Sequence, residues 1–565
     1  MISVYIDKNL EKHASKINYA LENLFSILGY SWKILTNDDC PKDNETLIYY
    51  CDKLLEKEDL DRLAKHFSLI YIKADTDFYT NGVYSGEKLK NNIRRIEILK
   101  KVFPIICQKN IEHPILISKA LQYEYASIEF DLIGNIFFHL AEQEFKQQNP
   151  DDLVKKKKHK NESAFEEFHS FPYMNRLILV LDKTIQEFLR PDTILVKKSL
   201  WPKNEQIAFT LSYNVDSLHK WKIGYTFKAF FEGFYLLFSL KWNYFFKSII
   251  SWVNYMVSNI EPYWNFHDIN EKEAIIKARS TWFLYKKTNN TPEIDYDLND
   301  EDLSHTLEEL VHYGSELAFL SSNRASDTNQ FKEEFEAFSN KLKPVNPGIR
   351  HLQVKSHSEN SMVLERDLKF LYDSSKISSR EYGFANGTCF PYKVWPGVLK
   401  SNVRDIWEIP INFNEKAISL SKYNSIPFET AKSYVRELFS TAKDLKGLVH
   451  FSFNISSFTD ISYLHRLYSY IIDQSRTYTA YRASLSQIIL WLEKRNKVKI
   501  EIKHNKLLFT FPDDLEEFSV RFFGNYKFIM AEGGNCACKD KTIRFYNVIK
   551  NSVVTVYLEK DSNSF

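Results

Sequence analysis

The stretch WPKNEQIAFTLSYNVDSLHKW, Trp201 to Trp221, decides the fold of this chain. It opens on a Trp-Pro break and continues as a strand-like run from Ile207 to Val215. Alternate residues of a strand share a face, which predicts a polar and an apolar side here. The polar side consists of Ser212, Asn214 and Asp216, and the apolar side of Leu211, Tyr213 and Val215. A strand that presents polar groups at its end is suited to a catalytic or binding pocket.

Composition indicates an ordinary folded chain. Its 565 residues, 44% of them hydrophobic and 26% charged, are enough for roughly three domains. A net charge of +2 indicates no strongly charged partner. The basic run Lys155–Lys160 lies in a polar stretch and is predicted to be a solvated loop, so we expect no nucleic acid. The sequence contains neither GxGxxG nor GxxxxGK[ST], so no Gly-rich phosphate loop is predicted.

Cysteine usage and the amino terminus predict a reduced, cytoplasmic protein. The cysteines are Cys40, Cys51, Cys107, Cys389, Cys536 and Cys538, too few in a chain this long for a disulfide framework. The C-x-C pair Cys536 and Cys538 lacks a second pair or a nearby His at zinc spacing, so we expect a plain reduced turn. The amino-terminal MISVYIDKNLEK is charged where a signal peptide needs an apolar run.

Residues 1–195 alternate strand-like and helix-like segments, which is typical of an α/β domain with a largely parallel sheet. The predicted strands are Ile2–Ile6, Thr46–Tyr50 and Ser68–Ile72, and the predicted helices are Leu10–Leu28 and Leu54–Phe67. A further long helix is predicted over Glu124–Phe145, with Glu129 and Asp131 at its surface.

Residues 200–495 repeat longer strand and helix segments, which predicts a barrel-like α/β domain with its site at the carboxyl ends of the strands. After the opening strand, further strands are predicted at Ser280–Tyr285, Glu316–Leu320, Asp405–Ile411 and Gly447–Phe453. Helices are predicted near Ile269–Ala278 and Asp300–Tyr313.

The aromatic-rich segment 224–256 is interrupted by Lys228, Glu232, Lys241 and Lys247, too often for the roughly 20 apolar residues of a membrane span. It predicts an amphipathic pair of helices packed over the adjacent domain. A membrane-surface or partner-binding face is the alternative.

Residues 496–565 consist of short alternating runs between turn residues, which predicts a small all-β domain. The runs are Lys497–Ile502, Lys506–Phe511, Ser519–Phe523, Lys527–Ala531, Thr542–Val548 and Ser552–Leu558. We expect this domain to cap the barrel, and sugar binding on its strands is the alternative.

A series of short motifs follows AFTLSYNVD in a fixed order. They are PYWNF (Pro262–Phe266), STWFLY (Ser280–Tyr285), YGSELAFLSS (Tyr313–Ser322), GIRH (Gly348–His351), LKFLYDSS (Leu368–Ser375), GFANGTCFPY (Gly383–Tyr392) and LVHFSFN (Leu448–Asn454). Each is weak alone, but together they resemble the polysaccharide deacetylase family, in the bacterial branch with an extra amino-terminal α/β domain. The resemblance implies a distorted (β/α) barrel at 200–495, between an α/β domain at 1–195 and a β domain at 496–565.

The chemistry that the resemblance implies is metal-dependent hydrolysis of a sugar acetamido group. A divalent metal such as zinc, held by a carboxylate and two histidines, activates water; a second carboxylate takes the water proton and a late histidine protonates the amine.

Four positions that the resemblance assigns to this chemistry have side chains that cannot perform it. Asn214 stands for the base, Leu320 for a ligand histidine, Ala385 for an arginine and Phe453 for the late histidine. The carboxylate ligand is kept as Asp216. Since these losses together remove every step, the sequence predicts a catalytically degenerate protein without a cofactor.

The remaining pocket candidates are Asp216, Arg350, His351, Trp264, Asn386 and Asn454, with a structural ion pair the alternative role for Arg350. A rebuilt metal site would use Asp216, His351 and His267. His450, three residues before Phe453, is predicted to face the opposite side of its strand.

The expected function is carbohydrate binding or assembly in cell-surface polysaccharide metabolism, with a glycan or polysaccharide intermediate as partner. Trp264, Tyr213 and Trp395 are predicted either to stack on sugar rings or to belong to the core. Two alternatives stay open: an active metal-dependent N-deacetylase with a rebuilt site, and a membrane-peripheral scaffold that uses 224–256.

Overall fold

The computed structural model describes most of the chain. The described residues are 1–35, 45–53, 55–80, 83–84, 86–98, 100–143, 171–221, 238, 242–259, 261–287, 294–322, 328–351, 359–378, 380–395, 405–421, 424–459 and 463–561. The chain divides into two compact units. The first comprises Met1–Asn204, Asn386–Thr388 and Leu490–Phe565, and the second Glu205–Ala385 and Cys389–Ile489.

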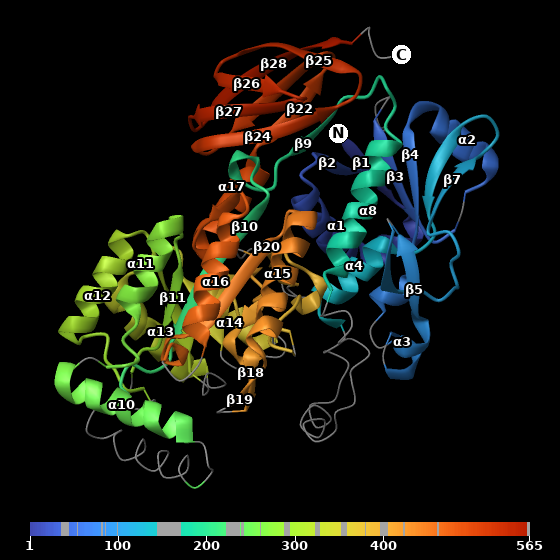
Figure 1. Cartoon of the computed structure of the whole chain (residues 1–565). Coiled ribbons are helices and arrows are strands. Elements are labelled where there is room, and N and C mark those ends of the chain that lie inside the picture. Colours follow the sequence, from blue (N-terminus) through green and yellow to red (C-terminus); the bar gives the residue numbers. More distant parts are fainter. Residues whose placement is uncertain are drawn as a thin grey trace. The chain divides into compact units, whose positions relative to one another are not determined.

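The amino-terminal part of the first unit is an α/β sheet, as predicted (Figure 1). Its strand order is β2 (Trp32–Leu35), β1 (Ile2–Ile6), β3 (Thr46–Cys51), β4 (Ser68–Lys73), β8 (Glu124–Ile128) and β7 (Ile115–Lys119). All these pairings are parallel except that of β7 with β8. The helices of this part are α1 (Ala14–Leu28), α2 (Lys57–His66), α4 (Leu132–Leu140) and α8 (Tyr173–Glu187).

The predicted long helix over Glu124–Phe145 is wrong. Its first residues form β8, and α4 begins only at Leu132. A strand buried on both faces shows the same run of apolar residues as a buried helix, so periodicity could not separate them. Asp131, also predicted at the surface, is buried. Its carboxylate caps α4 by accepting from the N–H of Gly134 at 2.6 Å. Burial raises the pKa of Asp131 to about 7.

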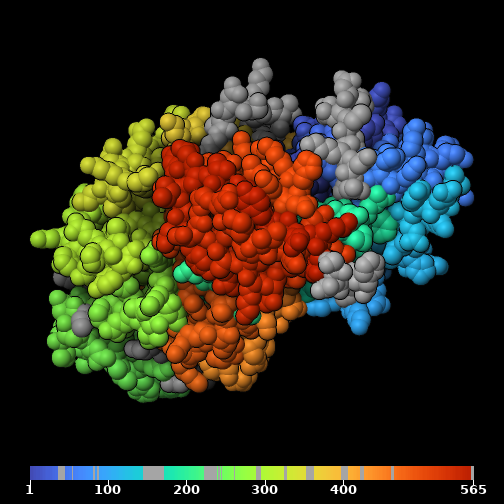
Figure 2. Space-filling model, turned by 90° about the horizontal axis from the view of Figure 1, so that it is seen from above, coloured from blue at the N-terminus to red at the C-terminus, as the bar shows by residue number. Residues whose placement is uncertain are grey.

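The carboxyl-terminal part of the first unit is a β-sandwich, shown in red as one compact mass in Figure 2. One sheet has the order β22 (Lys499–Lys503), β23 (Lys506–Phe511), β28 (Ser552–Lys560) and β25 (Tyr526–Glu532). The other has the order β26 (Asn535–Lys539), β27 (Thr542–Val548), β24 (Leu515–Phe523) and β9 (Leu195–Lys198). The sheets meet through the rings of Phe509 and Phe545, whose centroids are 4.7 Å apart.

Two details of this sandwich differ from the sequence analysis. Cys536 and Cys538 lie in strand β26, paired with β27, and not in a turn. Both are free thiols, as are Cys51, Cys107 and Cys389. The sandwich also takes its strand β9 from residues before 200, so it is not built from 496–565 alone.

The second unit is the barrel, and the predicted strand Ile207–Val215 is confirmed as β10. Neighbouring parallel strands follow the order β14 (Tyr372–Asp373), β13 (Gly348–His351), β12 (Glu316–Ser321), β11 (Thr281–Leu284), β10 and β20 (Leu448–Asn454). The helices α11 (Phe266–Ile276), α12 (Glu301–His312), α13 (Thr328–Leu342), α14 (Glu359–Asp367), α15 (Phe428–Leu445) and α16 (Leu464–Arg476) lie outside the strands (Figure 1).

One segment closes this barrel. It begins as β16 (Trp407–Glu408), paired with β14, and ends as β17 (Phe413–Asn414), paired with β20. Between them the N–H of Ile411 donates to the carbonyl of Lys376 at 2.8 Å, and that of Asn412 to His450 at 2.9 Å. The predicted strand Asp405–Ile411 is therefore short, because the chain changes partner from one edge to the other. The predicted barrel is confirmed.

Helix α10 (Trp242–Ser258) confirms the carboxyl-terminal helix of the pair predicted over 224–256. The rest of that pair, apart from residue 238, lies outside the described residues.

Candidate functional site at the carboxyl ends of the barrel strands

The centre of the barrel is occupied by the guanidinium of Arg350, on β13, which is only 2% exposed. All five of its N–H groups have an oxygen acceptor. The acceptors are the carbonyl of Ser374 (2.8 Å), Asn214 Oδ1 (2.8 Å) and the hydroxyls of Ser452 (2.9 Å), Ser212 (2.9 Å) and Ser374 (3.1 Å). None of these acceptors is a carboxylate. Burial lowers the pKa of Arg350 to about 9, a value that still leaves it charged at neutral pH.

The acceptors come from strands on several sides of the barrel. Ser212 and Asn214 are the predicted polar face of β10, and Ser452 belongs to β20. The guanidinium also lies over the ring of Phe283, on β11, at 3.9 Å. The predicted polar face of β10 is thus confirmed, and the predicted apolar face packs outward: the hydroxyl of Tyr213 contacts Glu273 on α11 at 2.5 Å.

His450 extends the same buried network. Its Nε2 lies 2.8 Å from the Ser212 hydroxyl and its Nδ1 lies 3.2 Å from the carbonyl of Pro410. Because a carbonyl only accepts, Nδ1 donates and Nε2 accepts the Ser212 proton. Burial and the Arg350 charge lower the pKa of His450, which keeps the ring neutral. A Ser–His pair can serve as nucleophile and base, but Ser212 is fully buried and its oxygen already accepts from Arg350.

The end of β10 meets the end of β20. The amide of Asn214 donates to Asn454 Oδ1 at 2.8 Å. Asp216, just beyond β10, accepts from the N–H of Ser456 at 3.2 Å and from its hydroxyl at 2.5 Å. Burial raises the pKa of Asp216, and the bonds from Ser456 oppose that shift.

Glu415 is a second acid at this end of the barrel, and the sequence analysis missed it. Its carboxylate accepts from the N–H of Asn454 and the hydroxyl of Ser457, each at 3.3 Å. Burial, reinforced by the charge of Asp216, raises the pKa of Glu415 to about 7. Glu415 follows the closing segment, which carries no recognisable motif, so only the closure of the barrel reveals its position.

The family-implied metal does not fit this end of the barrel. Leu320 faces the interior beside Arg350, in register with it on the neighbouring strand, and has no ligand atom. Asp216 is bonded to Ser456, and no group of three His, Cys, Asp or Glu ligands within the described residues contains it. The donor set of a carboxylate with two histidines is therefore not assembled around Asp216.

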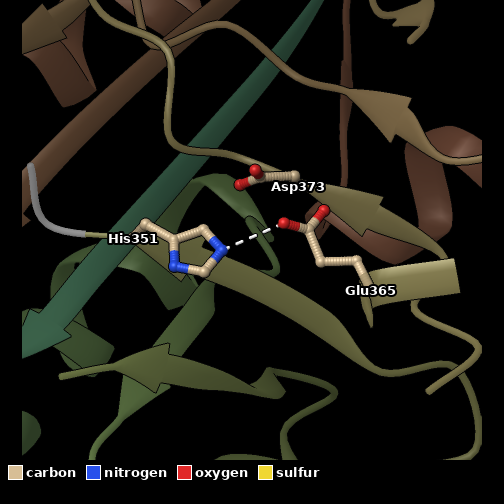
Figure 3. A group of neighbouring side chains, drawn as sticks. All are labelled: His351, Glu365 and Asp373. Atoms are coloured by element: carbon tan, nitrogen blue, oxygen red, sulfur yellow. Dashed lines mark hydrogen bonds and ion pairs between the residues drawn. The ribbon is translucent and has the colours of Figure 1, made fainter. Parts of the chain in front are cut away.

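The proposed alternative ligands also lie apart. His267 is on the exposed face of α11, where it contacts Glu271 at 3.2 Å. His351 follows Arg350 on β13 and so faces the opposite side, where its ring stacks on Phe331 of α13. Instead of Asp216 and His267, the structure places Glu365 and Asp373 beside His351 (Figure 3).

The remaining predicted positions are more scattered. Phe453 packs outward against Phe458 and Tyr468, so a histidine there would not face Arg350. His450 lies on the opposite side of the strand from Phe453, as predicted, and that side is the barrel interior. Ala385 is buried and carries no functional group. Asn386 is buried with a left-handed backbone and belongs to the first unit.

Of the three aromatic candidates, Tyr213 is core. Trp264 and Trp395 are half-buried. The loop of Trp264 is held beside the end of β20 by the amide of Asn265, which donates to the carbonyl of Phe458 at 2.9 Å.

No protein-family model and no curated protein matches this chain. Solved structures do show similarity. Agd3, a carbohydrate deacetylase, is 8% identical, with 99% of this chain and 98% of that chain covered and a TM-score of 0.35. A Mycobacterium smegmatis protein assigned as a polysaccharide deacetylase is 14% identical, with 52% and 92% covered and a TM-score of 0.35. The allantoinase Puue is 10% identical, with 52% and 92% covered and a TM-score of 0.34.

Identities and TM-scores this low carry no conclusion about the chemistry of this chain. Polysaccharide deacetylases are among the structures that this chain resembles, as its sequence motifs predicted.

Replacing Arg350 tests the central network. Arg350→Lys offers three donors where the barrel supplies five acceptors, so we expect the free energy of unfolding to fall by roughly 2–4 kcal/mol. Urea denaturation measures this loss. Arg436→Lys, on the exposed face of α15, is the matched control and should change stability little. Equal stability of the two variants would contradict the role given to Arg350.

Glu415 gives a pH dependence of known sign. Between its ordinary pKa of 4.5 and about 7, the folded chain keeps a proton on Glu415 that the unfolded chain releases. This group therefore lowers the free energy of unfolding as pH rises through that window. Relative to wild type, Glu415→Gln should gain roughly 1–3 kcal/mol from pH 4.5 to 7. Denaturation at several pH values measures the slope, with exposed Glu308→Gln as the control that should show none.

Proposed function

We propose that this chain is a glycan-binding protein of polysaccharide metabolism, with a deacetylase-like barrel that does not hydrolyse acetamido groups. The observation that carries the proposal is the occupation of the barrel centre by Arg350. A positive side chain stands at the ends of the strands, and its N–H groups are all taken by protein oxygens. The position implied for the base is Asn214, whose oxygen accepts from that same guanidinium.

The residual acids do not replace the missing chemistry. Asp216 and Glu415 are both held by residues 454–457, and burial raises the pKa of each. Neither residue has a histidine partner in the described bonds, so neither has the imidazole that the implied metal site or the late protonation step requires. Amide hydrolysis without a base or an activated water forgoes about 10²–10⁴-fold for general acid–base catalysis alone.

A hollow on the helix side of the barrel supports glycan binding. It is a shallow hollow of about 430 Å³ that lies largely open to solvent. Its walls come from α11, α15 and α16 and include the rings of Phe428 and Tyr470. Half-exposed aromatic rings offer apolar faces to the C–H groups of sugars.

The same hollow carries positive charge, which favours an acidic glycan. Lys272, Lys432 and Arg466 line it with one acid, Asp473, and the Lys432 ammonium also pairs with Glu429 at 3.0 Å. The guanidinium of Arg466 lies 4.5 Å from the Phe428 ring centroid, and the ammonium of Lys432 lies 5.1 Å from that of Tyr470. Cations held on ring faces are positioned for a sugar carboxylate beside a stacked sugar.

Binding of an acidic oligosaccharide tests this proposal. We expect isothermal titration calorimetry to detect an oligogalacturonide and a neutral oligosaccharide to bind more weakly. Phe428→Ala should weaken binding about 10-fold, since one stacking contact is worth roughly 1 kcal/mol or more. Arg436→Gln, exposed on the same helix, is the control and should bind normally.

Three results would count against it. Absence of any hit on a glycan array removes glycan binding. If Trp264→Ala abolished binding but Phe428→Ala did not, the glycan would bind at the mouth of the barrel instead. Release of acetate from an N-acetylated glycan by wild type, abolished in Asp216→Asn, would show an active deacetylase.

A second candidate function, membrane-peripheral binding, is favoured by α10. Large apolar side chains are exposed along this helix at positions that share a face. They are Trp242 (50% exposed), Phe246 (55%), Ile250 (58%), Val253 (45%) and Val257 (84%). Lys247 is the one charged residue of α10, so the helix suits the apolar boundary of a lipid surface better than a charged protein. Within the described residues, no helix has the length and apolarity to cross a membrane.

Liposome flotation tests this candidate. Wild-type protein should float with phosphatidylcholine vesicles, and Ile250→Asp should reduce the floating fraction several-fold, because a charge in the apolar face opposes insertion. Ile275→Asp is the matched control, since Ile275 is 65% exposed but lies on α11. Wild-type protein that stays wholly in the aqueous fraction excludes membrane contact through α10.

A further inference from the structure

Three ligand-type side chains meet on the helix side of the barrel, away from Arg350. They are His351 at the end of β13, Glu365 on α14 and Asp373 on β14 (Figure 3). One ligand atom from each lies within 4.8 Å of the others. His351 Nε2 is 3.1 Å from Glu365 Oε1. Two ligands that share one zinc ion at about 2.1 Å, with angles near 90–110°, are roughly 3.0–3.4 Å apart, so this spacing suits a shared ion.

The His351 imidazole is fixed by contacts of the kind that metal-binding histidines have. Its Nδ1 lies 3.0 Å from the hydroxyl of Ser321, and its ring stacks on Phe331 at 5.7 Å. These contacts fix the ring so that Nε2 points at the carboxylates. A hydrogen bond on the second nitrogen, outside the ligands themselves, is usual for metal-binding histidines. Asp373 is held in the same way, by a hydrogen bond from the Ser375 hydroxyl.

Burial gives the cluster an electrostatic reason to bind a cation. The Glu365 side chain is 1% exposed and Asp373 is fully buried, while His351 is 10% exposed. Glu365 and Asp373 are two buried acids beside one imidazole, and a divalent ion would interact favourably with both. Arg350 attracts Asp373 electrostatically from the other side of the sheet, but its N–H groups bond to other oxygens. A divalent ion would neutralise the pair directly.

We propose that His351, Glu365 and Asp373 form a zinc-binding site that fastens α14 to β13 and β14. One imidazole and two carboxylates are suitable ligands for Zn²⁺, and three protein ligands leave one position for water. The site is separate from the position that the family resemblance implies, since it shares no residue with Asp216 or Leu320. It is independent of glycan binding, which is proposed for the hollow on α11, α15 and α16.

The test measures zinc on the purified full chain. After chelation and exchange into metal-free buffer, protein given ZnCl₂ and passed through gel filtration should retain one zinc per chain by mass spectrometry. Zinc bound only to the folded state should also raise the melting temperature by about 5 °C. Glu365→Gln should lose most of the zinc, because the amide keeps the shape of the side chain but not its charge.

Matched variants distinguish this site from others. His305→Asn removes the histidine of an exposed His–Glu pair, His305 with Glu309, and should retain full zinc. Ser321→Ala leaves the three ligands in place and should weaken affinity about 10-fold through loss of the Nδ1 partner. Asp216→Asn should retain zinc, and a loss there with normal binding in Glu365→Gln would place the ion inside the barrel.

The proposal stays testable if Glu365→Gln fails to fold. Wild-type protein that binds no zinc and shows no rise in melting temperature overturns it and leaves a buried imidazole–carboxylate ion pair. Substitution by Co²⁺ gives a second readout, since a four-coordinate site with three protein ligands produces a visible d–d absorption band that Ser321→Ala should shift. An absence of that band in wild type also overturns the site.

Discussion

The barrel depends on one buried cation that is held by neutral oxygens. Transferring a guanidinium from water to the centre of a barrel is costly unless each N–H finds an acceptor. Here β10, β20 and residue 374 supply all five, and the guanidinium itself comes from β13. The network therefore links strands that are not neighbours in the sheet. Ser212 is also hydrogen-bonded to His450, and Asn214 to Asn454, which extends the network. Polar side chains at this position join the strands together and are not left available to a substrate.

Because successive side chains of a strand point to opposite faces, neighbouring residues here lie on opposite sides of the barrel wall. Arg350 faces the interior and His351 faces α13 and α14. Asn454 faces Asn214, whereas Phe453 packs outward against Phe458. Comparing a motif residue by residue cannot show which face a side chain occupies. A shift of one residue along a strand moves the side chain from the interior of the barrel to its outer face. The position implied for the late histidine shows the consequence: Phe453 does not face Arg350, and the imidazole that does so is His450.

Sequence periodicity was sufficient for the elements that have one clear face. The strand Ile207–Val215, its polar side and the α/β character of the amino-terminal sheet and of the barrel follow from it. It failed where both faces are buried, as at Glu124–Ile128, and at Cys536, where a short edge strand follows two glycines. Glu415 and Glu365 could not be found at all. Each comes from a segment without a motif, and only closure of the barrel or packing of α14 brings it to its partners.

The ligand types present explain why the centre and the flank of the barrel differ. At the end of β10, Asp216 is bonded to Ser456, and the residue beside Arg350 on β12 is Leu320, which has no ligand atom. Burial raises the pKa of Asp216 and of Glu415, and neither acid has an imidazole in its described bonds. On the helix side, His351 brings an imidazole to Glu365 and Asp373, so three ligand-type side chains meet there. The zinc proposal therefore follows from the direction in which β13 turns its side chains: Arg350 inward to neutral oxygens, and His351 outward to two acids.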